Sequence, residues 1–143
     1  MTFNKLSFLR HPNCGWHNSY FYYLYYSKIR AHLEKCGLGK MLDLGSGDGH
    51  YKELLTHFGF SYESVDWSAS PHAGEPDIVG DLNQNLAIPN TYCEALFCWS
   101  VLEHLSEPKL FLHECSRILK PDGKLILQVP FMWQVHEAPH DFF

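Results

Sequence analysis

The sequence predicts an α/β domain built on a parallel sheet, and two observations carry this prediction. Short apolar runs typical of buried strands alternate along the 143 residues with segments whose apolar residues recur at helical spacing. A glycine-rich turn follows the first run and leads into a helical segment, in the sequence Met41-Leu42-Asp43-Leu44-Gly45-Ser46-Gly47-Asp48-Gly49-His50-Tyr51. Strands that alternate with helices form parallel sheets with right-handed crossovers, and ligands bind at the carboxyl ends of such strands.

The amino-terminal part is expected to hold an irregular segment and one helix before the first strand. Residues 1–18 contain Pro12, Gly15 and several polar residues, so this stretch is predicted to be an irregular lead-in and residues 19–143 the domain. Ser19 can cap a helix that runs to Cys36 and stops at the glycine that follows.

The other elements follow from periodicity and from stop signals. Asp48 is predicted to cap the helix after the glycine turn, and Gly59 ends that helix. Residues 82–93 are too broken by asparagine and proline to predict a helix. A later helix begins around Pro108 and ends at the Lys-Pro-Asp-Gly segment 120–123. The predicted strands are residues 40–45, 61–66, 77–80, 94–101 and 124–129.

Composition narrows the classes of partner and compartment. The net charge is -5 with only 11 Lys and Arg residues, which are scattered, so we expect no nucleic acid partner. Five cysteines without a C-x-x-C pair favour a reducing, cytoplasmic setting, and no segment has the pattern of a signal peptide or a membrane span. His11, Cys14 and His17 have a spacing that zinc can use, but no fourth ligand is near in sequence, so no metal site is predicted.

The glycine spacing distinguishes two kinds of nucleotide site. A dinucleotide fold uses G-x-G-x-x-G to hold a pyrophosphate at a helix start. Here the glycines are Gly45, Gly47 and Gly49, and His50 stands where the third glycine of that fingerprint belongs. The turn therefore suits an adenosyl group joined to an amino acid, and Asp43 is placed to bind the ammonium of a methionine moiety.

This segment resembles motif I of the class I, Rossmann-like S-adenosylmethionine-dependent methyltransferases. The segments Trp99–Leu105 and Arg117–Gly123 are similar to later motifs of the same family, so the resemblance covers about residues 40–131. It implies a strand order of 3-2-1-4-5, S-adenosylmethionine as cofactor, and transfer of its methyl group to the oxygen or nitrogen of a small molecule. It also implies that the cofactor is bound by Asp43, Gly45, Ser46, Gly47, Gly49, Asp66, Trp67, Asp81, Leu82, Trp99 and Ser100.

Several of these assignments have a structural alternative. Asp66 ends the second predicted strand, where an ionised carboxylate can accept hydrogen bonds from both ribose hydroxyls, but it could also be a helix cap or turn residue. Trp67 could lie against the adenine or in the core. Asp81 could meet the adenine amino group, with the Leu82 amide at the ring, or simply form a turn.

Two histidines after the fifth predicted strand are candidates for a catalytic base. His136 and His140 would lie on the ligand side of the sheet, and a histidine near neutrality can accept a proton from a substrate hydroxyl. The alternative is an ordinary polar loop. Glu103 and His104 could also act in catalysis, although such a pair can instead order the start of a helix and close the floor of the ligand site.

The end of the sequence departs from the resembled family. That fold has seven strands, but the chain stops at Phe143, so strands six and seven are expected to be missing and strand five to lie at an open edge. Self-association through this edge is then predicted, because unpaired strand edges associate. Two other functions stay open: a catalytically incomplete domain that binds S-adenosylmethionine or a partner, and, disfavoured by His50, an NAD-dependent oxidoreductase.

Overall fold

The computed structural model describes residues 27–67, 74–130 and 138–142. The chain divides into two units, residues 1–37 and residues 38–143. The predicted lead-in, and with it the predicted domain boundary, lies outside the described residues.

The described part of the first unit contains a helix over residues 27–33. It falls within the helix predicted from Ser19 to Cys36, whose beginning lies outside the described residues. Arg30 donates through Nε to Glu34 Oε1 at 2.7 Å, four residues further on. Such pairs join neighbouring side chains on the exposed face of a helix.

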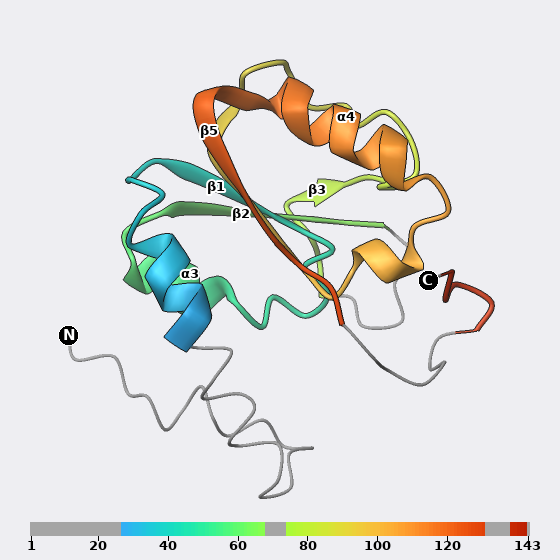
Figure 1. Cartoon of the computed structure of the whole chain (residues 1–143), viewed down its shortest axis with the longest axis horizontal. Helices are drawn as coiled ribbons and strands as arrows, with labels where there is room; N and C mark the ends of the chain where they lie inside the picture. Colours follow the sequence, from blue (N-terminus) through green and yellow to red (C-terminus); the bar gives the residue numbers. More distant parts are fainter. Residues whose placement is uncertain (1–26, 68–73, 131–137, 143) are drawn as a thin grey trace, which may run out of the picture. The chain divides into compact units, whose positions relative to one another are not determined.

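Five parallel strands form one sheet in the second unit (Figure 1). Their order is β3-β2-β1-β4-β5, which confirms the predicted fold class and strand order. The elements are β1 (Lys40–Leu44), α3 (Lys52–His57), β2 (Ser61–Asp66), β3 (Ile78–Val79), β4 (Cys93–Trp99), the short 3-10 helix η1 (Leu102–His104), α4 (Pro108–Ile118) and β5 (Leu119–Gln128).

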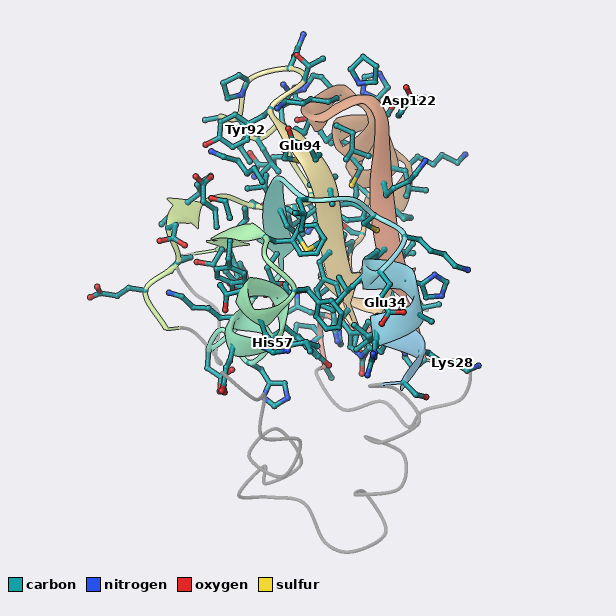
Figure 2. All side chains as sticks on the ribbon, turned by 90° about the vertical axis from the view of Figure 1, so that its left-hand side faces the viewer. Lys28, Glu34, His57, Tyr92, Glu94 and Asp122 are labelled. Carbon is teal, nitrogen blue, oxygen red and sulfur yellow. The ribbon has the colours of Figure 1, made fainter. Side chains whose placement is uncertain are left out.

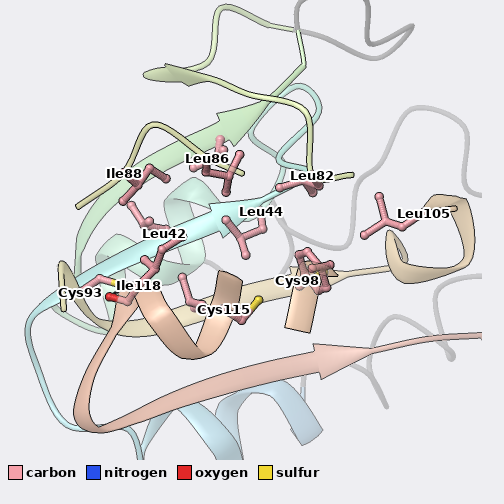
Figure 3. Packing of buried hydrophobic residues seen from close by; sticks show 13 residues of the cluster. Leu42, Leu44, Leu82, Leu86, Ile88, Cys93, Cys98, Leu105, Cys115 and Ile118 are labelled. Atoms are coloured by element: carbon pink, nitrogen blue, oxygen red, sulfur yellow. Dashed lines mark hydrogen bonds between the residues drawn. The ribbon is translucent and has the colours of Figure 1, made fainter. Parts of the chain in front are cut away.

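The register of the sheet assigns its residues to two faces. Asp43 of β1 lies opposite Ser64 of β2 and Phe97 of β4, so these three side chains share one face. The alternate residues of the same strands, together with α4, form the main apolar core on the other face (Figure 3). This core consists of Leu42, Leu44, Val65, Leu82, Leu86, Ile88, Cys93, Leu96, Cys98, Leu105, Phe111, Cys115 and Ile118.

The irregular segment before β4 is held to α4 by an ion pair whose carboxylate is buried and whose guanidinium is partly exposed. Glu114 is 3% exposed, and its carboxylate accepts the Leu86 N–H at 3.0 Å and the Arg117 guanidinium at 2.6 Å. The same guanidinium donates to the carbonyl oxygens of Leu86 and Ile88. Because these bonds satisfy backbone groups outside regular structure, the segment needs no helix of its own, as its sequence indicated.

A second polar network lies where the strands begin, at the edge opposite to their carboxyl ends. The Lys40 ammonium donates to Glu63 Oε1 at 2.7 Å and to the Tyr92 hydroxyl at 2.8 Å, and that hydroxyl donates to Glu63 Oε2 at 2.9 Å. Figure 2 shows Tyr92 and Glu94 together at this end, where Glu94 accepts the Lys40 backbone N–H at 2.7 Å and pairs with Lys120. These contacts tie β1, β2, β4 and β5 together at their amino ends.

Two local predictions need correction. Asp48 does not cap the helix after the glycine turn, because α3 begins only at Lys52 with Tyr51 at its N-cap. The turn continues through Gly49, whose N–H donates to Ser46 O at 2.9 Å, and residues with positive φ delay the first helical turn.

The fifth strand also begins earlier than the predicted residue 124. α4 ends at Ile118 and β5 starts directly with Leu119, with a register shift against β4 before Lys124. The segment that was expected only to end the helix is therefore part of an irregular strand start, in which Asp122 has a φ of +64°.

Candidate functional site

The glycine turn lies at the carboxyl ends of the strands and is shaped by Asp66. Asp66 ends β2, is 6% exposed, and accepts the Gly47 N–H through Oδ2 at 2.6 Å and the Trp67 N–H through Oδ1 at 2.8 Å. A carboxylate can accept further bonds at both oxygens, so these contacts leave capacity for a diol. The structure thus brings together the two parts of the motif that the sequence placed 21 residues apart, Gly45 and Asp66.

Three glycines of the turn have backbone conformations that side chains rarely adopt. The φ angles of Gly45, Gly47 and Gly49 are +74°, +54° and +76°. A Cβ at Gly45 would lie 2.5 Å from Cγ2 of Val101, so the side chain of Val101, just beyond the end of β4, packs directly on the turn. At Gly49 the nearest atom would be the Tyr62 hydroxyl at 3.8 Å, which is ordinary contact.

Ser46 adds a buried polar group to the same turn. Ser46 is 8% exposed, and within the described part of the chain its hydroxyl has no hydrogen-bond partner. Because a buried hydroxyl without a partner is costly, its presence beside a bare glycine backbone fits a site that a polar ligand completes. The turn therefore fits the cofactor that the resemblance implies.

Asp43 lies beneath this turn as a buried carboxylate. It is 2% exposed, and the Tyr62 hydroxyl donates to its Oδ2 at 3.0 Å. Burial raises the pKa of Asp43 to about 7, the hydrogen bond from Tyr62 opposes the rise, and the charge of Asp66 adds to it. A buried carboxylate of this kind is stabilised by a cation, as the predicted role at an ammonium requires.

Aromatic rings line the end of β4 next to the turn. Phe97 and Trp99 stack with an interplanar angle of 8° and centroids 5.6 Å apart, and the Tyr51 ring lies 4.9 Å from that of Phe97. Ser100 follows with a φ of +53°, and its hydroxyl donates to Gln128 Oε1 at 2.7 Å. In this structure Ser100 thus joins the exits of β4 and β5.

The two predicted adenine contacts have structural partners. Asp81 accepts the Asn83 N–H at 2.9 Å and the Gln84 side-chain amide at 2.9 Å, which is the arrangement of a turn aspartate. The side chain of Leu82 is 7% exposed and belongs to the apolar core. Their predicted contacts with the cofactor stay predictions.

Residues 138–142 return to the carboxyl edge and meet the exits of β2 and β4. The His140 ring stands edge-on to Trp67 with centroids 5.6 Å apart, and Trp67 is 38% exposed. Asp141 Oδ1 lies 3.0 Å from Nδ1 of His104, and the Phe142 N–H donates to Glu103 O at 2.9 Å. Glu103 and His104 therefore help hold this segment. His136 lies outside the described residues, as do His11, Cys14 and His17.

Two residues of the site were missed in the sequence. Asp66 lies four residues after Tyr62 in β2, so both side chains lie on the same face of the sheet. This even spacing within the predicted strand was the signal that could have identified Tyr62. Asp141 offered no such signal, because its contact with His104 joins residues far apart in sequence. Both lie next to predicted site residues.

Comparison with known proteins gives a consistent family. A family model described as a methyltransferase domain matches residues 20–141. A ubiquinone biosynthesis O-methyltransferase of Xanthomonas oryzae pv. oryzae is 30% identical over 110 residues, which are 69% of this chain and 46% of that protein. The mitochondrial ubiquinone biosynthesis O-methyltransferase of Schizosaccharomyces pombe is 33% identical over 101 residues, covering 62% of this chain and 36% of the relative. The chain thus spans about half the length of the first of these relatives and less of the second.

Solved structures show the same fold. A protein of Pyrococcus horikoshii OT3 superposes with a TM-score of 0.62 at 24% identity, covering 87% of this chain and 61% of that one. An S-adenosylmethionine dependent methyltransferase from Mesorhizobium loti has a TM-score of 0.52 at 20% identity, and the match covers 65% of this chain and 49% of that one.

These findings decide the class of the protein. Within the described residues, no helix is both long and apolar enough to cross a membrane. The family match confirms the predicted resemblance to the methyltransferases. With its glycine turn, its 3-2-1-4-5 sheet and a match over most of its length, the chain belongs to the family of class I methyltransferase domains.

Proposed function

We propose that the whole protein transfers a methyl group from S-adenosylmethionine to a small molecule, and that the acceptor atom is an oxygen. The observation that carries the proposal is the turn built by Gly45, Gly47 and Asp66 at the carboxyl edge of the sheet. The names of the matched relatives, O-methyltransferases of ubiquinone biosynthesis, favour oxygen over nitrogen.

The cofactor assignment follows from the chemistry of each side chain. Asp66 would accept the ribose hydroxyls, Asp43 would bind the ammonium, and the Ser46 hydroxyl would gain a partner in the ligand. Trp67, at the exit of β2, would flank the adenine, while Trp99 would border the methionine portion near β4. When bound, S-adenosylmethionine supplies a methyl group already activated by the sulfonium.

The chain's own contribution to the transfer is then positioning. Holding an acceptor oxygen in line with the methyl group can contribute ~7–11 kcal/mol through effective molarity. His140, placed beside Trp67 at the same edge, is the described histidine that we assign to the acceptor side. A neutral imidazole there would take the proton that the acceptor hydroxyl loses.

The proposal also covers the compartment and the partners of the protein. Among the described residues, the buried cysteines Cys93, Cys98 and Cys115 are free thiols, which favours a reducing, cytoplasmic setting. Among the described strands β5 lies at an edge of the sheet, which supports contact with a further strand, from a second copy or another segment.

Transfer of labelled methyl groups tests the function. The protein is incubated with S-adenosylmethionine labelled on the methyl group and with a panel of phenols, aliphatic alcohols and amines. We expect label on a phenol or alcohol, strongly reduced in an Asp66→Ala variant. Label only on amines would contradict the choice of oxygen, and equal transfer by the variant would contradict the assigned site.

A further inference from the structure

Tyr62 reaches the carboxylate that the proposed function assigns to the cofactor's ammonium. It lies opposite Met41 in the register of β1 and β2, two residues behind Asp43, and its side chain extends forward along the shared face. Its hydroxyl donates to Asp43 Oδ2 at 3.0 Å. The same hydroxyl lies 3.8 Å from the Cβ position of Gly49, so it is placed under the glycine turn.

The surroundings of this pair are mainly acidic or neutral. From the exit of β2, the charge of Asp66 acts on Asp43, and from β4 the buried thiol of Cys98 acts as a neutral group, because burial raises its pKa well above the ordinary value. Burial raises the pKa of the Tyr62 hydroxyl as well, and the charge of Asp43 adds to this, so Tyr62 stays a donor.

Further charges face Tyr62 from the turn, from β3's start and from α3. Asp48 and Asp77 both raise the pKa of its hydroxyl through their negative charges. The Lys52 ammonium lies 5.6 Å from the centre of the Tyr62 ring. The hydrogen bond from Tyr62 is therefore a local contact that stabilises the charge of Asp43 within a set of acidic neighbours.

We propose that Tyr62 is a positioning residue of the cofactor site, which orients the Asp43 carboxylate and stabilises its negative charge for the α-ammonium of the bound ligand. This inference rests on the proposed function, because it takes the ligand to be an adenosyl amino acid. A hydrogen bond donated to a carboxylate favours its ionised form, whereas burial favours its neutral form.

The sign of the pH effect follows from the ionised form being the one that binds. Since the pKa of Asp43 is about 7 in the free domain, the fraction ready to bind an ammonium falls as the pH is lowered. Between about pH 8 and about pH 6 the affinity for S-adenosylhomocysteine should drop about tenfold, since a proton must leave Asp43 first. Tyr62→Phe removes the donor, so this loss should begin at higher pH.

Calorimetric titration of the full chain with two ligands tests the inference. S-Adenosylhomocysteine carries the ammonium, whereas 5′-methylthioadenosine shares its nucleoside and thioether and lacks the amino acid. We expect Tyr62→Phe to shift the pH profile of the first ligand upward and to leave the second unchanged. Asp43→Asn should remove the pH dependence for S-adenosylhomocysteine. Tyr92→Phe, which loses a hydroxyl bonded to Glu63 at the opposite edge of the sheet, is the matched control and should shift neither profile.

Several outcomes of these titrations would overturn the role of Tyr62. An unshifted profile in Tyr62→Phe, or equal losses for both ligands at every pH, would overturn the inference. Equal affinity of the native chain for S-adenosylhomocysteine at about pH 8 and about pH 6 would also overturn it. This measurement does not depend on the folding of any variant. A pH effect shared by both ligands would belong to another group of the turn, such as His50, and would also overturn it. If the native chain binds neither ligand, the proposed function fails, and the inference falls with it.

Discussion

Replacing Asp66 by alanine should weaken both the fold and the binding of the cofactor. The carboxylate is 6% exposed and accepts two backbone N–H groups, from Gly47 and Trp67. A hydrogen bond to a charged acceptor contributes ~1.5–3 kcal/mol. Because water can reach the two amides once the side chain is removed, we expect the free energy of unfolding to fall by about the value of one such bond and not of two.

The loss of affinity should come in addition, because the ribose hydroxyls lose the same acceptor. A further ~1.5–3 kcal/mol corresponds to a roughly ten- to hundredfold higher dissociation constant for S-adenosylhomocysteine. Urea unfolding measures the first effect and calorimetric titration the second, on the same preparation. Both effects are expected in Asp66→Ala.

Asp77→Ala is the matched control. Asp77 also accepts two hydrogen bonds from β2, from the Ser64 N–H and the Ser64 hydroxyl, both at 2.8 Å, but it lies before β3 and not at the carboxyl edge. Its loss should lower stability and leave affinity nearly unchanged. The reasoning is refuted if Asp66→Ala loses stability with unchanged affinity, or if Asp77→Ala weakens binding as much.

Two further substitutions test the packing around the site. Gly45→Ala should cost ~1–3 kcal/mol more than Gly49→Ala in urea unfolding, because both have positive φ but only the first would press a Cβ against Val101, at 2.5 Å; equal losses would mean that Val101 yields freely. Glu114→Ala should lower the free energy of unfolding by ~1.5–3 kcal/mol, whereas Glu34→Ala, which breaks an exposed pair, should change it by under ~0.5 kcal/mol; similar small losses would show that the buried pair contributes little.

The strands and the position of the site could be predicted from local patterns in the sequence, whereas the order of the strands followed from the resemblance to a known family. The apolar runs indicated the strands, and the glycine turn with Asp66 indicated their carboxyl edge, where the structure places both. The early start of β5 was not predictable in the same way. It depends on pairing between Leu119 and Cys93 of β4, and a neighbour's register is not visible in one segment.

The contacts that were missed are long-range ones. The bond between Tyr62 and Asp43 requires the register of β1 against β2, and the pair of His104 with Asp141 requires the chain to return over the carboxyl edge. Asp48 was wrongly predicted as a cap because the cap rule assumes that the helix starts where the glycines end, whereas here a turn intervenes. Local propensity predicts elements better than it predicts their contacts.

The most direct test of the central claim is a calorimetric titration of this chain with S-adenosylhomocysteine and, separately, with NAD. The spacing of Gly45, Gly47 and Gly49 and the carboxylates of Asp43 and Asp66 predict micromolar-range binding of S-adenosylhomocysteine and no binding of NAD. Tight binding of NAD without any response to S-adenosylhomocysteine would contradict the account.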